Sequence, residues 1–155
     1  MAALHARAFT NMRPWSAAEF GGLLQGAGVF WHGSSTGFIL GRVTLDEAEI
    51  LTLAVEPNAR RAGLGRALLD QFETSAKAAG ASRAFLEVAK DNAGACGLYR
   101  AAGYLQIGCR PGYYVHQTPA ADSAVVSPLA SAADSAATTG TSQRVDALIL
   151  AKEAL

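Results

Sequence analysis

Apolar residues recur along this chain at two different spacings, which predict helices and strands in alternation. Between residues 64 and 79 they return at helical spacing, so that one face of the predicted helix is apolar. Elsewhere, short apolar runs are typical of strands. The predicted helices are 1–9, 16–24, 64–79 and 92–103. The predicted strands are 29–32, 37–45, 50–55, 84–89, 104–115 and 144–151. The first strands predict an antiparallel meander that feeds a central strand at 50–55, which we expect to be buried on both faces.

Residues 117–143 differ from the rest of the chain, because Ala, Ser and Thr dominate and no helical or strand period is sustained. We interpret this segment as a flexible insertion. Residues 1–116 and 144–155 then form one predicted α/β (α+β) domain. A chain of 155 residues is long enough to build one such domain around a real core.

The composition excludes several classes of protein. The chain carries 13 basic and 13 acidic residues, so its net charge gives no general attraction to nucleic acid. No apolar run reaches the length of a membrane span, and the N-terminus lacks the apolar core of a signal peptide. The two cysteines, Cys96 and Cys109, fit neither a disulfide framework nor a metal-type spacing. We therefore expect a cytoplasmic protein without a bound metal.

A basic, glycine-containing loop joins the strand at 50–55 to the long helix, and its chemistry suits an anion. Gly63 and Gly65 stand at the mouth of the helix, where the first N–H groups lack partners and the helix dipole is positive. Neither glycine has a Cβ atom, so a ligand could approach the backbone closely. The arginines that add positive charge are Arg60, Arg61 and Arg66. Together these features favour a phosphate or pyrophosphate.

The loop alone also fits a tight strand-to-helix turn with solvated arginines. Two familiar phosphate loops fit poorly. The chain lacks the G-x-x-x-x-G-K-[ST] sequence of a nucleotide-hydrolysing P-loop, and Leu68 stands where a dinucleotide-binding loop needs its third glycine.

One carboxylate, Glu87, interrupts the apolar strand at 84–89. By alternation it shares a face with Phe85 and Ala89. Because burying an unpaired charge is costly, Glu87 needs either water, an ion-pair partner or a function. The structural interpretation is an edge position or an ion pair, and the functional one is a general base held in a cleft.

Tyr99 lies on the inner face of the predicted helix at 92–103, which Asn92 can cap. Periodicity alone indicates core packing with a locally satisfied hydroxyl.

Three motifs in one order bear a resemblance to a known family. They are L-A-V-E-P with R-R-A-G-L-G-R-A-L-L, then L-E-V-A-K-D-N, then G-L-Y-R-A-A-G-Y. Together they resemble the GCN5-related N-acetyltransferase (GNAT) superfamily. The segments R-P-W-S, L-D-E-A-E, G-Y-Y and D-A-L-I-L are similar to its RimI type, the ribosomal-protein-alanine N-acetyltransferases. The resemblance covers nearly all of the chain outside the insertion, and it implies a mixed, mostly antiparallel sheet that is splayed at the cofactor site and flanked by helices.

Two departures from the family stand out. The chain begins at its first helix, so the usual first strand is absent or displaced. The insertion at 117–143 is unusually long and falls on the acceptor side of the family, where it bears on peptide selectivity.

The resemblance also implies roles for single residues. Glu87 would be the general base, acting through a water, and Tyr99 would be the acid that protonates the coenzyme A sulfur. Backbone N–H groups from Leu53 to Val55 would polarise the thioester carbonyl, and Arg61 to Arg66 would hold the pyrophosphate. The residues that the resemblance assigns to acetyl-coenzyme A are Leu53, Ala54, Val55, Arg61, Ala62, Gly63, Leu64, Gly65, Arg66 and Asn92. Direct transfer needs no cysteine nucleophile.

The implied reaction is acetylation of a protein N-terminus, with the N-terminal alanine of a small-subunit ribosomal protein as the implied acceptor. The enzyme would be a monomer or weak dimer without direct contact to nucleic acid or membrane. Two alternatives remain open at this point. One is the same fold acting on a lysine side chain or a small amine, and the other is a non-catalytic acyl-coenzyme A sensor.

Overall fold

The computed structural model describes residues 1–10, 13–116 and 143–155. Its helices are α1 (Ala2–Ala8), α2 (Ala17–Leu24), α3 (Leu64–Ala78) and α4 (Ala93–Ala101), with a 3-10 turn at Pro57–Ala59. Its strands are β1 (Val29–Gly33), β2 (Gly37–Thr44), β3 (Glu47–Val55), β4 (Arg83–Ala89), β5 (Leu105–His116) and β6 (Gln143–Glu153). Every predicted helix and strand is therefore present, with ends that differ by a few residues.

The strands form one six-stranded sheet in the order β1-β2-β3-β4-β6-β5. Neighbouring strands are antiparallel except for β3 and β4, which are parallel. The predicted mixed, mostly antiparallel sheet is thus confirmed, and its last two strands along the chain, β5 and β6, pair as antiparallel neighbours. Among the described strands none lies beyond β1, which forms one edge of the sheet.

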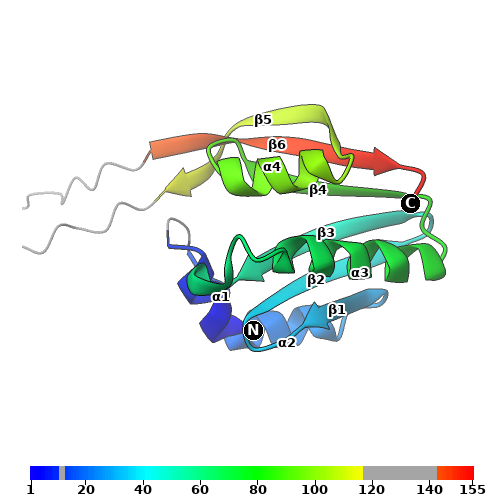
Figure 1. The fold of residues 1–155 in the computed structure, drawn as a ribbon, viewed down its shortest axis with the longest axis horizontal. Helices are drawn as coiled ribbons and strands as arrows, with labels where there is room; N and C mark the ends of the chain where they lie inside the picture. The colour runs from blue at the N-terminus through cyan, green and yellow to red at the C-terminus, as the bar shows by residue number, and fades with distance from the viewer. Residues whose placement is uncertain (11–12, 117–142) are drawn as a thin grey trace, which may run out of the picture.

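Two hydrophobic cores lie on opposite faces of this sheet (Figure 1). Helices α3 and α4 cover one face, and α1 and α2 cover the other near β1 and β2. The side chains of β2 alternate between the two cores, because Ile39 packs under α3 while Phe38 and Leu40 pack with α1 and α2. The sheet is therefore a middle layer between two groups of helices.

The central strand β3 differs from its prediction. It begins at Glu47 rather than at residue 50, and the expectation that residues 50–55 are buried on both faces is wrong. Buried and half-buried residues alternate along it, so Leu51, Leu53 and Val55 remain half-buried. A register shift opposite Leu40 inserts one extra residue. The shift moves Ala54 to the face opposite that of Ile50, as a β-bulge does.

The ends of two helices follow their sequence signals. The Ser16 hydroxyl accepts a hydrogen bond from the Glu19 N–H at 3.2 Å, and the Glu19 carboxylate accepts from the Ser16 N–H at 2.7 Å. These two bonds form a capping box at the start of α2. After α3, Gly80 adopts a φ of +96°, which lets the Ala81 N–H reach the Ala76 carbonyl at 3.0 Å.

Three further boundaries differ from prediction. The turn between β2 and β3 is at Leu45 and Asp46, so Leu45 lies outside the strand predicted to end there, and it takes a positive φ of 58°. Strand β6 begins at Gln143, one residue inside the expected insertion, and extends to Glu153. Residues 117–142 lie outside the described part of the chain. Among the helices that the structure describes, none is long and apolar enough to cross a membrane.

Candidate functional site

The parallel strands β3 and β4 part midway along their length. Their pairing runs from Glu47 opposite Arg83 to Ile50 opposite Leu86 and then stops. Beyond that point, Leu53 to Val55 still pair with β2 but not with β4. The predicted splay of the sheet is therefore confirmed. The predicted cofactor residues Leu53, Ala54 and Val55 lie where β3 has lost its β4 partner, and preorganised backbone donors there could polarise a carbonyl.

The loop after β3 leads into the N-terminus of α3 through two left-handed residues. Arg61 has a φ of 64°, and Gly63, the N-cap of α3, has a φ of 82°. A Cβ atom on Gly63 would meet nothing within 4 Å, so space is open beside its backbone. A Cβ atom on Gly65 would lie 3.3 Å from Cδ2 of Leu98 in α4. The expected close approach of a ligand is therefore possible at Gly63, whereas Gly65 serves the packing of α3 on α4.

The three arginines of the loop do not act alike. Arg60 donates to the carbonyls of Val55 at 3.2 Å and Ala8 at 2.8 Å, so it ties the loop to β3 and α1. Arg66 pairs with Asp70 at 2.8 Å along α3. Within the described ranges no hydrogen bond or ion pair engages the exposed Arg61. Of the predicted basic side chains, Arg61 is the one left to face an anion together with the N–H groups at Ala62 to Gly65.

Asn92 has a structural task. Its side-chain oxygen accepts a hydrogen bond from the Ala95 N–H at 3.1 Å and caps α4. The predicted cap is confirmed, and the Asn92 amide N–H groups remain for a ligand contact.

Glu87 lies in β4 beyond the point where β3 and β4 part, and its side chain is 24% exposed. Its Oε1 atom is 3.0 Å from Nε of Arg110 in β5. One structural interpretation of Glu87 in the sequence was an ion pair, and that ion pair is present. A carboxylate so placed can also accept a proton, and the partner residue Arg110 was not predicted.

Tyr99 lies on the inner face of α4 and is buried in the core that α3 and α4 cover, as its helical periodicity predicts. Its ring meets the ring of Tyr104 edge-on, with the centroids 5.7 Å apart. Burial raises the pKa of Tyr99 above its ordinary value, and the neighbouring Tyr114 adds to the rise. The hydroxyl therefore keeps its proton at neutral pH, which a proton donor requires.

Tyr114 is a third candidate that sequence reasoning did not assign to the site. Its hydroxyl donates to the backbone carbonyl of Glu87 at 3.4 Å. Burial, and then the Glu87 carboxylate, raise the pKa of Tyr114 to about 12. Its hydroxyl therefore lies against the backbone of one predicted catalytic residue, Glu87. The available signal was the Tyr113-Tyr114 pair after Pro111-Gly112, but only the strand register shows which tyrosine faces Glu87.

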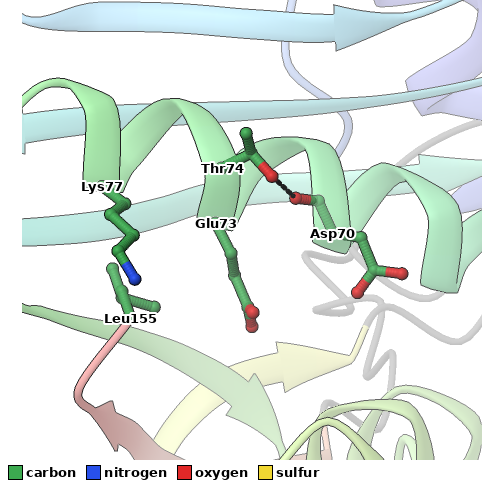
Figure 2. A pocket seen from close by; sticks show the side chains of 5 residues that line it. All are labelled: Asp70, Glu73, Thr74, Lys77 and Leu155. Carbon is green, nitrogen blue, oxygen red and sulfur yellow. Dashed lines mark hydrogen bonds between the residues drawn. The ribbon is translucent and has the colours of Figure 1, made fainter.

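A shallow hollow along α3 contains none of these residues. It is lined by Asp70, Glu73, Thr74, Lys77 and Leu155, and the Thr74 hydroxyl donates to the Asp70 carbonyl at 2.8 Å (Figure 2). Glu73 is paired with Lys152 at 2.7 Å, which ties α3 to β6. We therefore assign this hollow to the packing of the C-terminal strand and not to the reaction. In the part of the chain that the structure describes, no group of His, Cys, Asp and Glu side chains is arranged to hold a metal ion.

Comparisons with known proteins agree with this geometry. The sequence profile of the Acetyltransferase (GNAT) family matches residues 3–104. The ribosomal protein bS18-alanine N-acetyltransferase of Escherichia coli is 32% identical over 117 residues, which are 73% of this chain and 79% of that protein. The crystal structure of the ribosomal-protein-S18-alanine N-acetyltransferase from Escherichia coli has a TM-score of 0.72 and 28% identity, covering 99% of this chain and 84% of that one. A GNAT family acetyltransferase from Elizabethkingia anophelis with acetyl-CoA bound has a TM-score of 0.65 and 16% identity, covering 97% and 88% of the two chains.

Proposed function

Because the chain belongs to the GNAT family of acetyl-coenzyme A-dependent acetyltransferases, we propose that it acetylates the α-amine at the N-terminus of a protein. The proposed acceptor is the N-terminal alanine of a small-subunit ribosomal protein. The observation that carries this proposal is the likeness to the bS18-alanine N-acetyltransferase of Escherichia coli, which extends over most of both chains.

The chemistry needs a base for the amine, and Glu87 is the residue proposed for that task. An α-ammonium group must lose a proton before its nitrogen can attack a thioester carbonyl. The Glu87 carboxylate lies beyond the parting of β3 and β4, with one oxygen held by Arg110. It would accept the amine proton through a water, in the manner of a general base.

The leaving thiolate needs a proton, and Tyr99 is proposed to give it. Burial raises the pKa of Tyr99, so the hydroxyl retains its proton until the thiolate departs. The same burial makes the phenol a weak acid, so donation would accompany C–S bond cleavage rather than precede it. Tyr114, whose hydroxyl donates to the Glu87 carbonyl, would help to hold β4 in place at Glu87.

Backbone groups would bind the acetyl-coenzyme A. The N–H groups of Leu53 to Val55 would stabilise the negative charge that develops on the thioester oxygen, a contribution typically worth about 3 kcal/mol. The N–H groups from Ala62 to Gly65, with Arg61, would hold the pyrophosphate at the N-terminus of α3. Asn92 and Arg66 would also contact the cofactor, although their side chains already bond Ala95 and Asp70.

The setting of the reaction is also a proposal. Ribosomal proteins are made in the cytoplasm, so the enzyme would act there, as a monomer or weak dimer and without direct contact to nucleic acid or membrane. Residues 1–116 with 143–155 would form the catalytic domain, and 117–142 would be an insertion on the acceptor side.

A panel of acceptors tests the proposal. Peptides that begin with the first residues of the small-subunit ribosomal proteins would be compared with the same peptides blocked at the N-terminus, with lysine peptides and with small amines. We expect transfer to a free N-terminal alanine and none to its blocked counterpart, measured by mass spectrometry.

Other results would replace the proposal. Transfer to lysine peptides or small amines alone would move the enzyme to another acceptor class. Tight binding of acetyl-coenzyme A by calorimetry without transfer to any amine would favour a sensor.

A further inference from the structure

Strand β5 bulges next to Glu87, and the bulge has a defined structure. Arg110 stands opposite Ala147 on β6, and Tyr114 stands opposite Val145. The β5 residues 111–113 therefore stand opposite a single residue of β6, Asp146. The Asp146 carboxylate accepts a hydrogen bond from the Gly112 N–H at 3.1 Å, and Gly112 adopts a left-handed φ of 60°. Such a bulge re-aims the side chains on either side of it.

The two side chains that flank the bulge both turn to Glu87. Nε of Arg110 lies 3.0 Å from the Oε1 atom of Glu87, and the Tyr114 hydroxyl donates to the Glu87 carbonyl at 3.4 Å. The Arg110 guanidinium also lies 5.6 Å from the ring centre of Tyr113. Arg110 is thus held between a carboxylate and an aromatic face, and a planar guanidinium suits both contacts.

An exposed ion pair by itself contributes little to stability. The Arg110 side chain is 57% exposed, so the pair with Glu87 is not explained by folding energy alone. Among the ion pairs of the described chain, this one alone contains a residue proposed for catalysis. This ion pair would instead act through geometry, because holding the Oε1 atom of Glu87 in place also sets the direction in which its Oε2 atom points.

We propose that Arg110 is a positioning residue that holds the Glu87 carboxylate in the orientation in which Oε2 accepts, through a water, the proton of the acceptor amine. The inference rests on the proposed function and adds a residue to it. Arg110 itself touches neither the acetyl group nor the amine. It acts through Glu87, and its loss lowers turnover because the base is no longer aimed.

Steady-state kinetics of Arg110→Met, Glu87→Gln and the double variant test this inference. Assays use whichever amine the wild type acetylates. We expect Arg110→Met to lower kcat about 10- to 100-fold while the KM for acetyl-coenzyme A stays unchanged. If Arg110 acts through Glu87, the double variant is no slower than Glu87→Gln alone. Arg110→Lys is also expected to be slow, because a compact ammonium does not reproduce the planar stacking on Tyr113.

Arg42→Met is the matched control. Arg42 pairs with Glu49 at 2.6 Å across β2 and β3, and its side chain is also partly exposed. This variant should retain wild-type kinetics. The inference is overturned if Arg110→Met behaves like Arg42→Met, if Arg110→Lys retains full turnover, or if the two losses at Arg110 and Glu87 multiply in the double variant. A wild type that acetylates no N-terminal peptide would instead refute the proposed function, and the same cycle would then be run on its actual amine.

Discussion

At the scale of single residues, Tyr99 offers a sharp test because it is both buried and assigned to proton transfer. Tyr99→Phe removes the hydroxyl and keeps the ring that packs on Tyr104. Because burial raises the pKa of Tyr99, the lost group is a protonated phenol across the neutral range. We expect kcat to fall about 100-fold and the free energy of unfolding to change by less than about 0.5 kcal/mol. Steady-state kinetics and urea unfolding measure the two effects.

Tyr104→Phe is the matched control for that variant. Tyr104 is fully buried beside Tyr99, and its hydroxyl has no hydrogen-bond partner in the described structure. Burial and the nearby Glu73 raise the pKa of Tyr104 as well. Removing an unpaired buried hydroxyl should leave turnover unchanged and stability unchanged or higher. If Tyr99→Phe and Tyr104→Phe lose the same amount of turnover, the role of Tyr99 is purely structural.

The sequence could predict residues whose task is local. Ser16 and Asn92 cap the helices that follow them, and Glu87 stands out as a charge in an apolar strand. Arg110 and Tyr114 could not be predicted, because their relation to Glu87 depends on a bulge and on the register of a third strand. Pairing across strands far apart in sequence leaves no periodic signal in either strand.

At the scale of elements, two glycines test how tightly the helices pack on the sheet, because one is crowded by α3 and the other has open space around it. A Cβ atom on Gly41 of β2 would lie 2.2 Å from Cε2 of Phe72 in α3, so Gly41→Ala should destabilise the fold by about 2 kcal/mol. A Cβ atom on Gly22, inside α2, would meet nothing within 4 Å, so Gly22→Ala should stabilise by roughly 0.5–1 kcal/mol. Urea unfolding should give opposite signs, and the same sign in both would contradict this packing.

The loop before α3 is a second element with its own test. Gly63→Ala introduces no clash, but it places an alanine at a φ of 82°, which disfavours the loop by roughly 1 kcal/mol. If the N–H groups of this turn bind the pyrophosphate, acetyl-coenzyme A affinity should fall about tenfold in calorimetry, since a strained turn presents them less often. Gly97→Ala, in α4 with nothing within 4 Å, should bind like the wild type. Unchanged affinity in Gly63→Ala would remove the loop from the cofactor site.

Elements were predicted well where one periodicity holds along their whole length, as in α3. β3 shows why the burial of its residues was not predicted correctly. The apolar run at 50–55 predicts a strand with two buried faces. In the structure, the bulge opposite Leu40 moves the side chains that follow it to the opposite face of the sheet, and alternate residues are half-buried. A sequence pattern does not mark a bulge that contains no glycine, because the extra residue is recognised only from its partner strand.

At the scale of the whole molecule, the layered architecture and the splayed sheet follow from sequence and family likeness together. The order of helices and strands and their apolar faces predicted an α/β domain, whereas the parting of β3 from β4 came only from the resemblance. The splay could not be derived from either strand alone, since both continue as strands beyond Ile50 and Leu86, to Val55 and Ala89. The part of the chain from 117 to 142 lies outside this comparison.

His5 lies in the core beneath α1 and α2, and its protonation should make the free energy of unfolding of the whole domain depend on pH. His5 is buried against Phe9 and Trp15, with ring centroids 4.3 and 5.3 Å away, and its Nδ1 accepts the Trp15 N–H at 3.3 Å. Burial lowers the pKa of His5 below its ordinary 6.5, and the nearby Glu19 opposes this only in part. The unfolded chain therefore binds the proton first as the pH falls, so stability is complete above pH 6.5 and decreases below it.

Urea unfolding between pH 7.5 and 5.5 should show this loss in the wild type. The His5→Asn variant should show a flatter dependence, because an amide oxygen can accept the same backbone N–H and does not titrate. The Glu19 carboxylate near His5 does not titrate in this window, because Arg13 and the Ser16 backbone N–H lower the pKa of Glu19 to about 2. Leu40→Val, which thins the same core without changing a titratable group, is the control and should lower stability while keeping the wild-type slope. Since a small domain unfolds as one unit, an unchanged slope in His5→Asn would mean that the core beneath α1 and α2 is not what makes the fold sensitive to acid.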